Sequence, residues 1–252
     1  MHRVRVSHAR DLGIALVLAG LVFPPAALAQ WPPAPRTEWD AELSIYAWLW
    51  SADGTAEVTT SGGTADASFG DLDGPFDPGA SVRVETRSKY SALMAGVTYL
   101  HMDQAREVET PEGTTHGELN TRQVVLDAGA GYRLAPAFEI LGAARYYIIR
   151  TDGSFGADGI ENEDRSWMDV FLGGRLTNLY GPWSLSIRGD IGAGGSNLAW
   201  FGNAVVAYRA SARTSLRMEY RFLSTDRGGE GSVHSDWDVM ESGLGLGIGF
   251  GF

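Results

Sequence analysis

Apolar and polar residues alternate along most of the chain after residue 38. The segment 213–224 shows this most clearly, because Leu216, Met218 and Tyr220 alternate with Arg217 and Glu219. Successive side chains of a β-strand point to opposite faces, so a period of two indicates a strand with one apolar and one polar face. Helical periodicity is hard to find, and no segment approaches the roughly 20 apolar residues of a membrane-spanning helix. The pattern predicts an all-β protein.

Ten segments carry this alternation. They are 39–51, 79–88, 90–102, 119–133, 137–151, 165–177, 182–193, 197–209, 213–224 and 237–252. Short turns between them alternate with longer, acidic, glycine-rich loops, which fall at about 52–78, 103–118, 152–164 and 225–236. The exception is the tight connection 194–196, which would be an unusually short external turn. Outer-membrane barrels have short periplasmic turns and long external loops, and only closure satisfies every backbone group of a strand in lipid. We therefore expect a closed antiparallel transmembrane β-barrel of about ten strands.

Two alternatives to this architecture stay open. The first loop is long enough to hold extra strand pieces, Ala56 to Thr60 and Ala65 to Phe69, and the strand at 79–88 is less regular, so eight or twelve strands are the other counts. A soluble β-sandwich or lipocalin-like barrel would also alternate, with its charged faces toward water. The membrane barrel is favoured because the apolar faces carry few charges and because the chain closes on the aromatic Phe252, the usual sorting feature of outer-membrane barrels.

The first 29 residues have the features of a signal peptide. A basic start is followed by the apolar run 12–23, which is too short to remain as a membrane anchor. Ala27 and Ala29 then provide the small residues that signal peptidase requires. We expect cleavage near Ala29, a periplasmic leader at 30–38 and a barrel at 39–252. Cleavage removes three of the 20 basic residues and one of the 31 acidic ones, so the formal charge changes from −11 to −13. A protein with this much negative charge would repel the phosphate backbone of nucleic acids, so we expect no nucleic-acid partner.

The polar faces of the predicted strands carry equal numbers of opposite charges. The positive set is Arg83, Arg87, Arg145, Arg175, Arg188, Arg209, Arg217 and Arg221, and the negative set is Glu42, Glu85, Asp127, Glu139, Asp169, Asp190, Glu219 and Glu241. Charges inside a barrel are costly unless they are paired, so these residues are predicted to form an internal salt-bridge network. Ten strands enclose little more than side chains fill, and Tyr46, Trp48, Tyr147 and Phe171 would occupy much of the remaining space. A plugged barrel is therefore favoured over an open one.

Several of these segments together resemble a known family. The stretches that carry the resemblance are 45–49, Asp71-Leu72-Asp73, 166–175, 183–192, Ala207-Tyr208-Arg209, 219–223 and the closing Gly-Leu-Gly-Leu-Gly-Ile-Gly-Phe at 243–250. In this order, they resemble a family of proteobacterial outer-membrane β-barrel proteins of mostly uncharacterised members, akin to the opacity-type small barrels. The resemblance covers essentially all of the chain after the signal peptide. It implies a fold and a location in the outer membrane of a Gram-negative bacterium, and it implies no reaction.

Catalytic groups are sparse in this sequence. His234 with Asp236 and Asp238 could serve as a general base, but the spacing differs from that of the ten-stranded omptin proteases. Ser196 and His101 are the candidates for a lipid hydrolase. Each is better explained as a loop or interfacial residue, so we expect no catalytic site and no enzyme activity.

Acidic loop residues raise the question of a metal site. Asp71 and Asp73 with Asp77 gather carboxylates in a glycine-containing loop, and residues 158–164 do the same. Hard cations prefer several oxygen ligands, but neither segment has the spacing of an EF-hand. Hydrated loops are favoured, with divalent-cation bridges to lipopolysaccharide as the alternative, and no cofactor is expected.

The expected role is structural or interactive. The predicted partners are outer-membrane lipid and lipopolysaccharide, and the barrel-assembly machinery through the strand that ends at Phe252. A narrow channel for small solutes is the first alternative and an outer-membrane hydrolase the second. The sequence leaves the oligomeric state open.

Overall fold

The computed structural model describes residues 40–60, 63–69, 77–110, 113–155, 158–159, 163–228 and 237–252. These residues form β-strands and the turns between them. No helix in these ranges is long and apolar enough to cross a membrane. The predicted signal peptide (1–29) and leader (30–38) lie outside the described residues and stay predictions.

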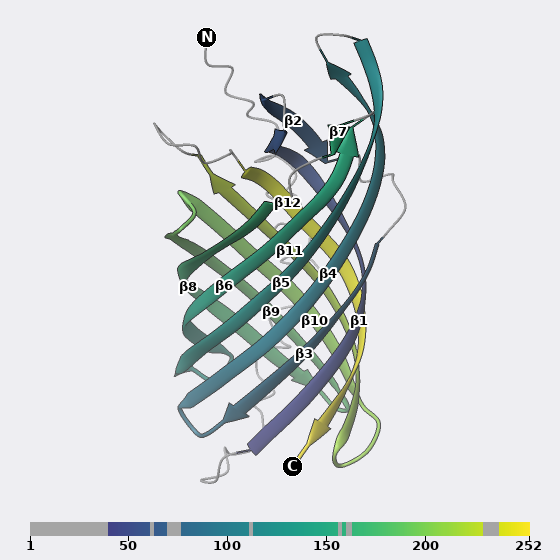
Figure 1. The fold of residues 1–252 in the computed structure, drawn as a ribbon. Coiled ribbons are helices and arrows are strands. Elements are labelled where there is room, and N and C mark those ends of the chain that lie inside the picture. Colours follow the sequence, from purple (N-terminus) through teal and green to yellow (C-terminus); the bar gives the residue numbers. More distant parts are fainter. Residues whose placement is uncertain are drawn as a thin grey trace. The chain divides into compact units, whose positions relative to one another are not determined.

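Ten antiparallel strands close into a barrel (Figure 1). In order around the ring they are β1 (Asp40–Thr60), β3 (Asp77–Arg87), β4 (Ser91–Thr110), β5 (Gly113–Ala135), β6 (Phe138–Phe155), β8 (Glu163–Tyr180), β9 (Trp183–Gly194), β10 (Leu198–Arg209), β11 (Thr214–Arg227) and β12 (Trp237–Gly251). Within the described ranges the ring contains the ten strands that the alternation predicts, and the predicted fold class is confirmed.

The last strand closes the ring by pairing with the first. The register of β12 against β1 runs from Gly251 opposite Glu42 to Trp237 opposite Ala56. Beyond it, Phe252 and Ala41 exchange two backbone hydrogen bonds of 3.0 and 3.2 Å. Phe252 is thus part of the closure of the barrel, because its backbone completes the β1–β12 seam.

The connections predicted to be external contain more strand than the alternation indicated. β1 continues to Thr60 and folds back on β2 (Gly63–Phe69), β4 and β5 pair as far as Thr110 opposite Gly113, and β7 (Asp158–Gly159) pairs with the end of β6. The loops predicted at 52–78, 103–118 and 152–164 are therefore largely hairpin extensions. Backbone pairing continues there without an apolar face, so these segments show no alternation from which a strand could be predicted. The candidate pieces Ala56 to Thr60 and Ala65 to Phe69 do pair, but outside the ring, which leaves its count at ten.

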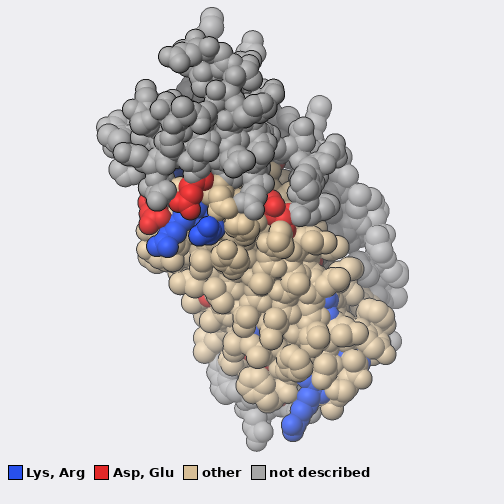
Figure 2. Space-filling model, turned by 45° about the vertical axis from the view of Figure 1, so that its right-hand side comes forward, with Lys and Arg blue, Asp and Glu red and all other residues tan. Residues whose placement is uncertain are grey.

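The outer surface is an apolar band between two groups of aromatic residues. The group beside the short turns is Tyr90, Tyr132, Trp183, Tyr208 and Phe250, and the group farther along the strands is Tyr99, Tyr146, Trp200 and Tyr220. All nine side chains are exposed, as are the aliphatic residues between them, such as Val170 and Leu172. Figure 2 shows one side of the barrel as a mostly uncharged band, with charged side chains gathered at its upper border and lower end. Aromatic girdles around an apolar band are typical of barrels that span a membrane.

Candidate functional site

The candidate site is the charged interior of the barrel. Alternation places the polar face of each strand inward, where the side chains of neighbouring and opposite strands meet. Among the described residues, the ion pairs of the interior fall into four groups, each centred on one carboxylate or arginine.

The first group joins β1 to β11 across the glycine-rich strand β12. Arg217 of β11 forms an ion pair with Glu42 of β1 and donates a hydrogen bond of 2.5 Å to Ser44. β12 lies between these two strands. A Cβ at Gly249 would lie 3.3 Å from both the Cδ of Arg217 and the Cδ of Glu42. The missing side chain on β12 therefore leaves the space through which the pair is made.

The second group centres on Glu219, whose side chain is fully buried. Its Oε1 accepts hydrogen bonds from Asn203 Nδ2 at 2.6 Å and from Arg83 Nη2 at 3.3 Å. Asn203 is on the adjacent strand β10, opposite residue 221. Arg83 reaches Glu219 from β3, across the lumen. Glu219 thus links β11 to β3, which are separated by β12 and β1 in the ring.

The third group centres on Arg175 of β8. Its guanidinium contacts Glu139 of the neighbouring strand β6 at 2.5 Å and Glu85 of β3 at 2.7 Å. Glu85 also pairs with Arg87 at 2.7 Å, and Glu139 with Arg133 at 3.5 Å. Arg133 is absent from the predicted network, because its position beside the turn at 136–137 gave no sign that it would reach an inward carboxylate.

The fourth group centres on Asp190 of β9. Its Oδ2 lies 2.6 Å from Arg188 Nη2 and 3.4 Å from Arg145 Nη2. The Arg145 guanidinium also lies over two aromatic rings, 4.4 Å from the centroid of Phe171 and 3.8 Å from that of Phe201. Arg145 is 3 % exposed. The aromatic faces therefore provide much of the environment of this buried cation.

Two residues of the predicted network have other positions. Asp169 is fully buried, but it accepts a hydrogen bond of 2.8 Å from the backbone N of Ser196 and one of 3.3 Å from Trp167 Nε1, and so holds the short 194–196 turn. Arg209 is exposed at the end of β10 beside the short turn 210–213, so its placement inside the barrel is wrong. Alternation gives the face of a residue but not its height along the strand, and Arg209 lies too close to the end to be enclosed.

Aromatic side chains fill much of the remaining lumen. Tyr46, Trp48, Tyr147 and Phe171 are all buried, as expected. Trp48 stacks with Tyr46 at 5.7 Å between ring centroids, donates a hydrogen bond of 2.7 Å to Ser81, and carries Arg221 over its face at 4.1 Å. Nearer the external end, Trp167 stacks on Tyr147 at 4.8 Å and meets Trp237 edge-on at 6.4 Å.

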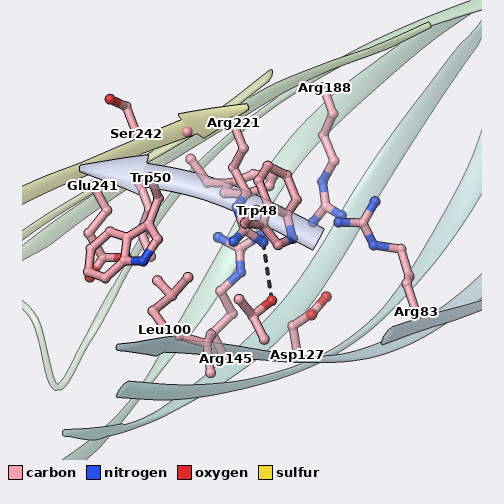
Figure 3. Close-up of a pocket in the computed structure, with 15 residues that line it drawn as sticks. Trp48, Trp50, Arg83, Leu100, Asp127, Arg145, Arg188, Arg221, Glu241 and Ser242 are labelled. Carbon is pink, nitrogen blue, oxygen red and sulfur yellow. Dashed lines mark hydrogen bonds between the residues drawn. The ribbon is translucent and has the colours of Figure 1, made fainter. Parts of the chain in front are cut away.

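Small cavities remain among these side chains, and two of them in the described part of the barrel have a volume of about 30 Å³ each. A space of this size holds on the order of two water molecules. Arg83 and Arg188 line both cavities. Figure 3 shows the cavity lined by Trp48 and Trp50, where Arg83, Arg145, Arg188 and Arg221 extend toward Trp48 from different strands. Asp127 and Glu241 also line it, and no arginine in the described ranges forms an ion pair with Asp127.

The other candidate residues do not assemble into a site in the described ranges. Asp71 and Asp73 lie outside the described residues, while Asp77 begins β3. His234 and Asp236 also lie outside them, and Asp238 is in β12. Ser196 follows β9, whereas His101 is on β4, which is not a neighbour of β9 or β10 in the sheet. The described residues contain no group of three or more acidic, His or Cys side chains that could hold a metal ion.

The glycine column of β12 gives a direct test of this packing. A Cβ at Gly247 would lie 2.5 Å from Tyr46 Cδ1 and 2.6 Å from the Ile45 carbonyl oxygen. We expect Gly247→Val to lower the free energy of unfolding by about 1–3 kcal/mol, because overpacking forces neighbouring groups to move. Urea unfolding of the refolded barrel measures it. Gly189→Val is the control, since a Cβ at Gly189 meets no atom within 4 Å; equal losses for the two variants would contradict the packing argument.

Comparison with known proteins identifies the type of fold. No protein-family model matches the chain, and no curated protein matches its sequence. The outer-membrane protease OmpT of Escherichia coli superposes with a TM-score of 0.53 at 9 % identity, covering 88 % of this chain and 99 % of that one. This chain has the fold of an outer-membrane β-barrel. At such low identity the likeness extends to the fold alone, and the resemblance to opacity-type barrels stays a prediction.

Smaller barrels match less closely. Ail, the attachment invasion locus protein of Yersinia pestis, has a TM-score of 0.40 at 14 % identity, covering 85 % of this chain and 99 % of that one. Neisserial surface protein A has a TM-score of 0.32 at 13 % identity, covering 84 % and 96 %.

Proposed function

We propose that this protein is an outer-membrane barrel with a largely plugged interior, which catalyses no reaction and holds its external hairpins as an interaction surface. The observation that carries the proposal is the interior itself, where ion pairs and aromatic rings from opposite walls meet across the lumen. A pore needs a continuous aqueous path, and water-filled porins have 16 or more strands.

The outer surface supports the membrane location. The exposed apolar band would be unstable in water over so large an area, and it is bordered by aromatic groups as lipid-facing barrels are. The signal peptide predicted at 1–29 would direct export, and the strand ending at Phe252 would engage the barrel-assembly machinery. Lipid would then contact the band, and lipopolysaccharide the external rim.

The external hairpins support an interaction role. β1 with β2, and β4 with β5, continue their backbone pairing to Thr60 opposite Gly63 and to Thr110 opposite Gly113, and their hairpins extend beyond the ring of strands (Figure 1). Their sequences are acidic, with Asp103, Glu107, Glu109 and Glu118 in the β4–β5 hairpin alone. The negative charge of these sequences would favour a cationic partner, or lipopolysaccharide phosphates through divalent cations.

Conductance in a planar bilayer tests the plugged interior. We expect the refolded protein to give no steady current, because ion pairs and aromatic rings from distant strands meet across the lumen. A double variant, Trp48→Ala with Arg221→Ala, is the positive control. The Arg221 guanidinium lies 4.1 Å from the centroid of the Trp48 ring, beside the cavity of Figure 3, and removal of both side chains should produce current. Uniform current steps from the unmodified protein would refute the plug and favour a narrow channel.

The absence of catalysis is tested separately. We expect phospholipid, lipopolysaccharide and peptide substrates to remain intact after incubation with the refolded protein. Cleavage of any of them would establish a hydrolase and refute this part of the proposal.

A further inference from the structure

The short connection between β10 and β11 carries two arginines at one end of the barrel. Arg209 is the last residue of β10 and Arg213 is the last residue before β11. Both side chains are exposed, and neither forms an ion pair with any residue in the described part of the chain. A guanidinium is always charged in a protein. Residues 209–213, called the basic turn below, therefore carry two uncompensated positive charges.

The strands around the basic turn are almost free of carboxylates. The sequence from 170 to 218 contains a single one, Asp190, which is buried and lies 2.6 Å from Arg188. Asp190 is far from the turn, because it stands near the other end of β9 (Trp183–Gly194). Asp40 is exposed at the same end as the turn, but it is on β1, which β12 separates from β11. The basic turn is thus a local positive excess in a chain whose formal charge is −11.

Aromatic side chains indicate the depth of the basic turn in a membrane. Tyr208 directly precedes Arg209, and its ring lies 4.9 Å from that of Trp183 between centroids. Both rings are exposed on the outer surface, in the aromatic group beside the short turns. Figure 2 shows Lys or Arg side chains at this lower end of the barrel. Because such aromatic groups lie at the level of lipid headgroups, the two arginines lie where the phosphates of that leaflet are found.

The opposite border of the apolar band has a different charge. Its exposed Arg150 is paired with Asp164, with 3.2 Å between Nε and Oδ1. Asp226 and Asp238 are also exposed there, directly opposite one another on β11 and β12. These carboxylates would repel an anionic headgroup. The two leaflets of a membrane would therefore meet surfaces of different charge.

The chemistry of the basic turn fits a phosphodiester with a net negative charge. Arginine presents several N–H donors in a planar fork that matches the geometry of phosphate oxygens. An anionic headgroup would neutralise the turn, whereas a zwitterionic headgroup brings a cation of its own. We propose that the basic turn binds the headgroup of an anionic phospholipid, through Arg209 and Arg213, in the leaflet that borders the short turns. The site rests on the membrane location in the proposed function, and it is independent of the plug and of the absence of catalysis.

Native mass spectrometry of the refolded barrel in detergent measures this binding. We expect phosphatidylglycerol to bind more tightly than phosphatidylcholine. The double variant Arg209→Gln with Arg213→Gln should bind phosphatidylglycerol about 25-fold more weakly, because each arginine near an anionic surface contributes about fivefold. The double variant Arg209→Lys with Arg213→Lys keeps both charges and should retain most of the binding. Both side chains are exposed, so the fold should be unchanged in either variant.

Arg150→Gln is the matched control, since it removes an exposed arginine that has its own carboxylate at the opposite border; phosphatidylglycerol binding should stay the same. Inorganic phosphate at the same concentration as the lipid should not compete, and competition would assign the turn to a free anion and overturn the proposal. Equal binding of the two lipids, or unchanged binding by the Gln double variant, would overturn it while leaving the membrane location intact. Failure of the barrel to insert into phospholipid vesicles would refute that location, and the site with it.

Discussion

Replacement of Glu219 by Ala should destabilise the barrel by about 3–5 kcal/mol. The residue is fully buried and accepts hydrogen bonds from Asn203 at 2.6 Å and Arg83 at 3.3 Å. Removing one member of a buried ion pair leaves the other charge uncompensated, and this cost exceeds what the pair itself contributes. The free energy of unfolding in urea, measured on protein refolded into lipid vesicles, gives the effect directly.

Two variants separate charge from shape at this position. Glu219→Gln keeps the volume and an oxygen that can accept from Asn203, so we expect a smaller loss than for Ala. Asp164→Ala breaks an exposed ion pair, in which Asp164 Oδ1 lies 3.2 Å from Arg150 Nε. Exposed pairs contribute about 0–1 kcal/mol to stability. If Glu219→Ala costs no more than Asp164→Ala, the interior is hydrated and open, and the plugged barrel is wrong.

The fold could be read from the sequence because period-two alternation is imposed by the membrane on one face and the lumen on the other. Strand β11 (Thr214–Arg227) is an example, since its alternating residues predicted the strand, its two faces and bounds within three residues of the observed ones. The external extensions of β4 and β5 could not be read in the same way. Polar residues there pair only through the backbone, which leaves no periodic signature.

Partners within the interior could not be predicted for a different reason. Arg217 and Glu42 lie 175 residues apart, and they meet only because β12 closes the ring between β1 and β11. The equal numbers of inward positive and negative residues predicted that ion pairs would form, but not which residues would pair. Asn203 was missed because a neutral side chain does not enter a charge count, although it makes the shortest hydrogen bond to Glu219.

Substitution of Leu172 by Arg should cost about 2–4 kcal/mol of stability in a phospholipid bilayer. Leu172 is 68 % exposed on β8, between the two aromatic groups of the outer surface. A charged residue at the middle of the lipid-facing band carries a penalty of this size, which falls to about 0–1 kcal/mol near the interfaces. Urea unfolding in vesicles measures the loss.

Leu134→Arg is the matched control for depth. Leu134 is also exposed, at 58 %, but it lies at the end of β5 beside a short turn, so its replacement should cost about 1 kcal/mol or less. The comparison decides between membrane and water as the surroundings of the outer face. In a soluble barrel both leucines would face water, and Arg at either position would have nearly the same small effect. A large difference between the two variants therefore requires a medium whose polarity changes along the strand, and a lipid bilayer is the medium with that property.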